Sequence, residues 1–99
     1  MPTYVVLYKF TDEGAKHVRS TVERADQVQR ENEQKGFKVN GLYWTQGQYD
    51  MIAVVEAPDE QSMLAGLFNI AAAGNVRSET LRAFTAAELA PVLQKMTRK

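Results

Sequence analysis

The apolar residues of this chain alternate with polar ones in some stretches and recur every three or four positions in others. Alternating runs rich in Val, Ile and aromatic residues, bounded by Gly, Pro or Asp, are typical of strands. The longer spacing is typical of amphipathic helices. On this basis we predict strands at 3–10, 37–45, 49–57 and 75–84, and helices at about 20–35, at 60–73 and after 85.

Several helix ends carry their own signals. Thr11 or Asp12 can cap a helix that follows the first strand. Ser20 with Glu23, and Thr85 with Glu88, have the spacing of a capping box, in which two side chains satisfy free backbone N–H groups. Glycines at 36 and 74 are suited to helix C-termini.

The predicted order is β-α-β-β-α-β-α. It corresponds to an α+β fold of the split βαβ, ferredoxin-like kind with one extra helix at the C-terminal end. In that arrangement the sheet is antiparallel with spatial order 4-1-3-2, and the helices cover only one of its faces.

Alternation sorts the strand residues into two sets, one for each face of the sheet. We assign the first set to the helix-covered face: Val5, Leu7, Lys9, Leu42, Trp44, Asp50, Ile52, Val54, Leu81 and Ala83. The second set would then form the open face: Tyr4, Val6, Tyr8, Phe10, Val39, Tyr43, Tyr49, Met51, Ala53, Val55, Val76, Thr80, Arg82 and Phe84. Monomers rarely expose such a patch, which predicts a homo-oligomer, a dimer or larger. The alternative is that the last helix folds back over this face.

Composition narrows the possible functions. The 99 residues favour a single domain, 1–99, and the 12 basic and 12 acidic residues balance, which gives no basis for binding nucleic acid. Cysteine is absent and His17 is the sole histidine, so we expect no metal site and no cofactor. The sequence has no apolar run long enough to span a membrane and no signal-peptide pattern, so we expect a cytoplasmic protein without a membrane partner.

One motif points to a family. Residues 45–50 read T-Q-G-Q-Y-D, at the predicted tip of the hairpin between the second and third strands. Together with YVVLYKFT at 4–11 and GNVRSETLRAFT at 74–85, this stretch resembles the GYD-domain family, named for the pattern that Gly47, Tyr49 and Asp50 form here. The resemblance covers almost the whole chain. It implies a ferredoxin-like fold of the dimeric α/β-barrel group and assigns no activity.

The topology predicts where a site would lie. Lys9, Trp44, Asp50 and Arg77 should gather at one rim of the sheet, all facing the helices. Asp50 could serve as a general base or hydrogen-bond acceptor, with Lys9 or Arg77 holding an anion. The alternative is that Asp50 pairs with one of these cations and receives backbone N–H bonds that fix the hairpin.

The tyrosines offer a second candidate site, on the opposite face. Tyr8, Tyr43 and Tyr49 could hold a small planar ligand between subunits, with Arg82 binding its carboxylate or phosphate. The alternative is that these rings only pack at the interface. Likewise, Trp44 either packs at the rim or stacks on a ligand.

Three kinds of function are compatible with this sequence. The first is an oligomer that binds a small molecule or has a structural or regulatory role. The second is a cofactor-independent enzyme, an oxygenase or isomerase acting on a small aromatic or lactone-like substrate, with no catalytic residue identified. RNA binding ranks last, because the net charge is +0 and strand four lacks an RNA-binding signature.

Overall fold

A computed structural model of the protein describes residues 1–96. The element order matches the predicted one, with a short first helix and a 3-10 turn added before the long helix. The elements are β1 (Thr3–Phe10), α1 (Asp12–Lys16), a 3-10 turn (Val18–Ser20), α2 (Thr21–Gln34), β2 (Lys38–Trp44), β3 (Met51–Glu56), α3 (Glu60–Ala73), β4 (Val76–Ala83) and α4 (Ala86–Gln94).

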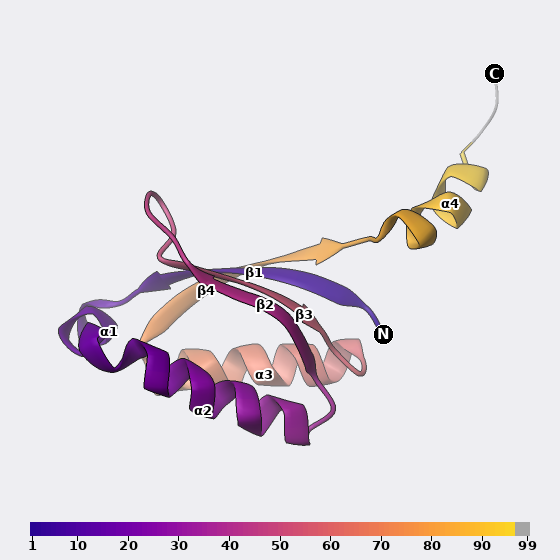
Figure 1. Cartoon of the computed structure of the whole chain (residues 1–99). Helices are drawn as coiled ribbons and strands as arrows, with labels where there is room; N and C mark the ends of the chain where they lie inside the picture. Colours follow the sequence, from indigo (N-terminus) through magenta and orange to yellow (C-terminus); the bar gives the residue numbers. More distant parts are fainter. Residues whose placement is uncertain (97–99) are drawn as a thin grey trace.

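The four strands form one antiparallel sheet in the order β2-β3-β1-β4, which confirms the predicted order read from its other edge. Helices α2 and α3 both lie beneath one face of this sheet (Figure 1). The α+β class is therefore confirmed, and no helix within residues 1–96 lies over the other face of the sheet.

The two faces were assigned the wrong way round for β1, β3 and β4. The buried core under the helices consists of Tyr4, Val6, Ala53, Val55, Ala57 and Met63. Hydrophobicity alone could not decide, because both faces are apolar. The covered face is the one that carries the small residues Ala53 and Ala57, which are 3% and 0% exposed and leave room for helix side chains.

A β-bulge explains the one misplaced residue of β2, Val39, whereas Leu42, Tyr43 and Trp44 lie on the faces predicted for them. The register of β2 against β3 shifts between Val39 and Gly41, so Asn40 is an extra residue. Val39 and Leu42 consequently pair with Val55 and Ala53 on the helix-covered face, and Tyr43 is left on the open face. Strict alternation had predicted Val39 and Tyr43 on the same side.

The open face carries its own apolar cluster. Val5 is in register with Val54 on one side and Leu81 on the other, and Leu7 is opposite Ile52. Leu81 is 45% exposed. We call these five residues the open-face cluster. An uncovered patch was thus predicted correctly, although with different residues.

Two of the three predicted caps are confirmed. The Thr11 hydroxyl accepts the Gly14 N–H at 3.1 Å, and Thr85 with Glu88 forms a full capping box at the start of α4. The predicted box at Ser20 was wrong, because the Ser20 hydroxyl donates instead to the His17 carbonyl at 2.9 Å.

Helix α4 does not fold back over the sheet. It projects beyond the body of the molecule, on the side opposite α2 and α3 (Figure 1). Its apolar residues Leu89, Val92 and Leu93 are all exposed. The radius of gyration is 15.4 Å, whereas a compact chain of 100 residues has about 13 Å. Within one chain, this apolar stripe therefore has no partner among residues 1–96.

The packing of α1 against the start of β4 can be tested by a substitution at Gly14. A Cβ atom at this position would lie 2.0 Å from the Asn75 carbonyl oxygen, which also accepts the Thr11 N–H. We expect Gly14→Ala to lower the free energy of unfolding by about 2–3 kcal/mol, because backbone would have to move. Urea denaturation measures this loss. The exposed neighbour Ala15→Gly should cost about 1 kcal/mol or less, and a Gly14→Ala variant as stable as the parent would contradict the packing.

Candidate functional site: the hairpin tip and a cavity under the sheet

The structure does not gather the four predicted rim residues on the helix-covered side. Lys9 and Arg77 are register partners on β1 and β4 and belong to the open face. Trp44 lies on the other face, where its indole N–H donates to the Thr21 hydroxyl on α2 at 3.1 Å. Asp50 lies at the base of the hairpin and faces β1.

Asp50 is a backbone anchor in this geometry. Its carboxylate accepts the Phe10 N–H at 2.8 Å, and its own N–H donates to the Tyr8 carbonyl at 2.8 Å. On the other side, its carbonyl accepts the Thr45 N–H. Within the described residues, Asp50 makes no ion pair with Lys9 or Arg77. The residue therefore holds the hairpin against β1 where the strand pairing ends.

The remaining motif residues shape the same turn. The Thr45 hydroxyl donates to the Tyr49 carbonyl at 2.6 Å, and Gly47 has φ +111°, a conformation that side chains disfavour. The tip of this hairpin bends to the side opposite the helices (Figure 1). Thus the backbone contacts of Thr45, Gly47 and Asp50 are accounted for by the local fold.

The predicted tyrosine cluster is divided between the two faces. The Tyr49 hydroxyl donates to the Glu79 carboxylate at 2.7 Å, with the Lys9 ammonium 5.5 Å from the ring centre. The hydrogen bond to Glu79 raises the pKa of Tyr49. Tyr43 is 61% exposed on the open face, whereas Tyr8 packs against the core on the covered face.

Arg82 lies away from the hairpin, at the base of the α4 arm. Its guanidinium is 4.4 Å from the Phe84 ring centre and 5.6 Å from that of Tyr4. It also donates to the Thr3 and Ala83 carbonyls and is 3.9 Å from the Glu88 carboxylate. Its contacts join β1, β4 and α4.

A cavity of about 180 Å³ lies between the sheet and the helices. Residues of β1, β2 and β3 form its roof, and α1, α2 and the end of α3 form its walls. It is lined mainly by apolar side chains: Phe10, Ala25, Val28, Val39, Leu42, Met51, Ala53, Val55, Ile70, Ala73 and Val76. For comparison, an apolar cavity of about 150 Å³ is large enough to hold benzene.

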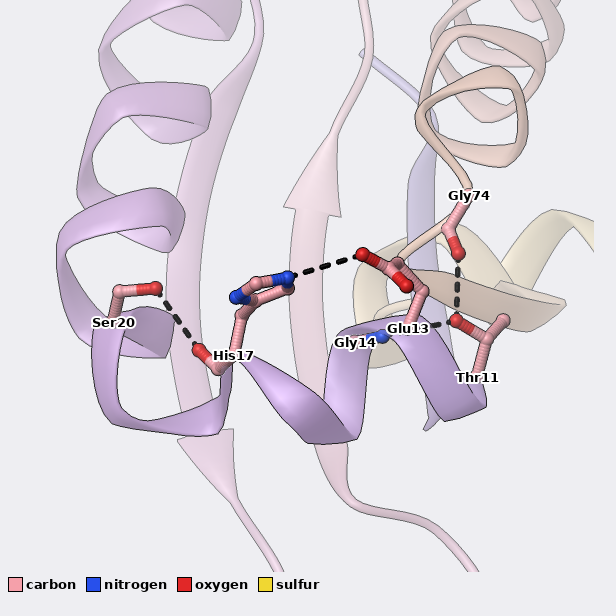
Figure 2. Close-up of polar contacts among 6 residues, drawn as sticks. All are labelled: Thr11, Glu13, Gly14, His17, Ser20 and Gly74. Carbon is pink, nitrogen blue, oxygen red and sulfur yellow. Dashed lines mark hydrogen bonds and ion pairs between the residues drawn. The ribbon is translucent and has the colours of Figure 1, made fainter.

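Apart from Gly14, the other residues that line this cavity are polar: Tyr8, His17, Thr21, Arg24, Gln29, Asn32 and Asn75. Tyr8 lines it from β1, and burial raises the pKa of its phenol to about 12. Arg24 and Asn32 line it from α2, and His17 from the segment between α1 and α2. Figure 2 shows the His17 ring turned toward Glu13, at 3.0 Å, and the Thr11 hydroxyl between the Gly14 amide and the Gly74 carbonyl. His17 and Glu13 are therefore paired with each other.

Among the predicted candidates, only Tyr8 lines the cavity. Sequence reasoning did not identify Arg24 as a candidate, although its position one turn before Val28 was a signal that it borders an apolar surface. Within residues 1–96, no cluster of three acidic or histidine side chains could hold a metal ion. In the same part of the chain, no helix has the length and apolar character to cross a membrane.

Comparisons with known proteins agree with the motif. A family model described as "GYD domain" matches residues 4–93. The chain is 37% identical over 90 residues to a Thermus thermophilus protein named "Glutamine synthetase and cystathionine beta-lyase binding protein". The match covers 90% of this chain and 95% of that protein. No solved structure gave a significant match.

The burial of Tyr8 predicts that the folded protein loses stability at alkaline pH. Its pKa is raised from 10.0 to about 12 in the folded protein, so folding favours the protonated form. The stabilisation is complete below pH 10 and disappears as the pH rises through 12. We expect the urea midpoint to fall across this window, and to fall less in Tyr8→Phe, which cannot ionise. Parallel pH profiles for the two proteins would contradict the burial of this phenol.

Proposed function

The chain belongs to the GYD domain family, and on that premise we propose that it works as a small oligomeric binding protein whose partners are other enzymes. The observation that carries this proposal is the presence of apolar surfaces that one chain leaves uncovered. Exposed apolar surface of this kind marks sites of protein–protein contact, and most of the affinity of an interface comes from a few well-packed residues near its centre.

The open-face cluster is proposed to pair with a second copy. Val54, Val5 and Leu81 form a continuous apolar row across three strands. A two-fold axis would set this row against itself, as symmetric dimers require. Because the net charge of the chain is +0, two copies do not repel each other strongly by their overall charge. Such pairing of sheets gives a dimeric α/β barrel. The α4 arm projects to the same side and could extend its apolar stripe over the second copy.

The outer side of α3 is proposed to contact the partner enzyme. This helix buries Met63 against the sheet, yet it also exposes Leu64 and Phe68, by 51% and 65%. A helix that is apolar all round is normally buried on both sides. By analogy with the relative's name, we propose glutamine synthetase and cystathionine β-lyase as partners, in the cytoplasm.

A cofactor-independent enzyme is the alternative function. Its support is weaker, because the buried candidate group in the cavity, Tyr8, stays protonated at neutral pH and cannot act there as a base. The same phenol can donate a hydrogen bond, which favours binding.

Self-association can be tested at Leu7, which lies between Ile52 and Glu79 at one end of the open-face cluster. Sedimentation velocity should show an oligomer for the parent and for Leu7→Met, and a monomer for Leu7→Lys. The lysine would place a charge in the interface, and in the monomer it faces Glu79, so folding is preserved. A parent protein that sediments as a monomer would contradict the proposed pairing.

Enzyme binding can be tested separately on α3. We expect Phe68→Ser to weaken binding to purified glutamine synthetase or cystathionine β-lyase by at least about tenfold in biolayer interferometry, and to leave the oligomer intact. Gln61→Ser, an exposed change on the same helix, is the control. If the parent binds neither enzyme, the proposed partners are wrong. If Phe68→Ser binds as well as the parent, the surface is wrong.

A further inference from the structure

The cavity between the sheet and the helices has the features of a ligand site, and neither the motif nor the family assigns one there. We propose that it binds a small monocarboxylate with an aromatic or branched aliphatic body. The site lies on the covered face of the sheet, so a ligand there and a second copy on the open face can be present together. The inference is independent of the proposed function.

The volume of the cavity and the apolar residues that line it determine the size and the apolar character of the ligand body. A cavity of about 180 Å³ accommodates a single ring or a short branched chain, since benzene fits in about 150 Å³. Leu42, Met51 and Val76 line it with apolar surface. A smaller hollow of about 30 Å³ continues from it between β1 and α3, and Tyr8 and Ile70 line both. Nucleotides and sugar phosphates are too large and too polar for this space.

Arg24 defines the charged end. Its side chain lines the cavity from α2 and is half-buried. Within residues 1–96, Arg24 makes no ion pair, and no acidic residue is among those that line the cavity. A guanidinium at the edge of an apolar cavity binds a carboxylate through two parallel hydrogen bonds. One such cation is suited to one negative charge.

Tyr8 supplies a donor from the roof of the cavity. Its ring lines the cavity, and its hydroxyl makes no hydrogen bond within residues 1–96. No buried side-chain oxygen of these residues lacks a partner, so this hydroxyl is accessible from the cavity. Because burial holds its pKa at about 12, the group stays protonated and can donate to an oxygen of the ligand. Arg24 and Tyr8 thus come from two elements on different sides of one cavity.

Isothermal titration calorimetry tests the site with two named probes, phenylacetate and 4-methylpentanoate. We expect at least one to bind with one site per chain, and about tenfold more tightly than the amide of the same acid. Arg24→Gln should remove the preference for the acid over the amide. Tyr8→Phe should weaken binding severalfold. Arg30→Gln, an exposed arginine on the same helix, should change neither.

Circular dichroism confirms that each variant is folded before titration. The proposal is overturned if neither acid binds the folded parent at millimolar concentration. It is equally overturned if acid and amide bind alike to the parent, or if the preference for the acid survives in Arg24→Gln. Sedimentation of the parent separates this result from the proposed function, because loss of ligand binding leaves the oligomer unchanged.

Discussion

Both faces of the sheet are apolar, but two helices can cover only one of them. The covered face buries Tyr4, Val6 and Val55 under α2 and α3, and this packing supplies most of the core. On the other face, no helix of the described part of the chain covers Val5, Leu7 and Ile52. Apolar surface of this kind is unfavourable in water. The need to cover this apolar surface connects the fold of one chain with the proposed assembly of two chains. In that assembly the projecting helix α4 would contact the second copy.

The sequence predicts the elements and their order well, because each has a local signal. The bounds of α3 and the cap at Thr85 depend on residues within a few positions of each other, and both were predicted correctly. The face that the helices cover was not predicted correctly. Alternation separates the strand residues into two apolar sets, but it does not indicate which set contacts the helices. The bulge at Asn40 adds a shift of one residue, and its one local signal is the adjacent Gly41, because glycine inside a strand often marks a bulge.

The candidate site, too, could be predicted only in part from local sequence patterns. Residues of the named motif, Thr45, Gly47 and Asp50, could be located at a hairpin tip from the sequence, but their contacts serve the turn and its attachment to β1. The cavity depends on how far α2 stands from the sheet, a property of the whole packing. Arg24 therefore looked like an ordinary surface residue, although it lines an apolar space next to Val28.

The central claim is that a second copy covers the open-face cluster. The most direct measurement is an isotope-filtered nuclear Overhauser experiment on a mixture of methyl-labelled and unlabelled chains. The account predicts intermolecular cross-peaks from the methyl groups of Val5, Leu7, Ile52, Val54 and Leu81, with none from the buried core residue Val6. Absence of intermolecular cross-peaks from this cluster, in a sample whose methyl signals are well resolved, would contradict it.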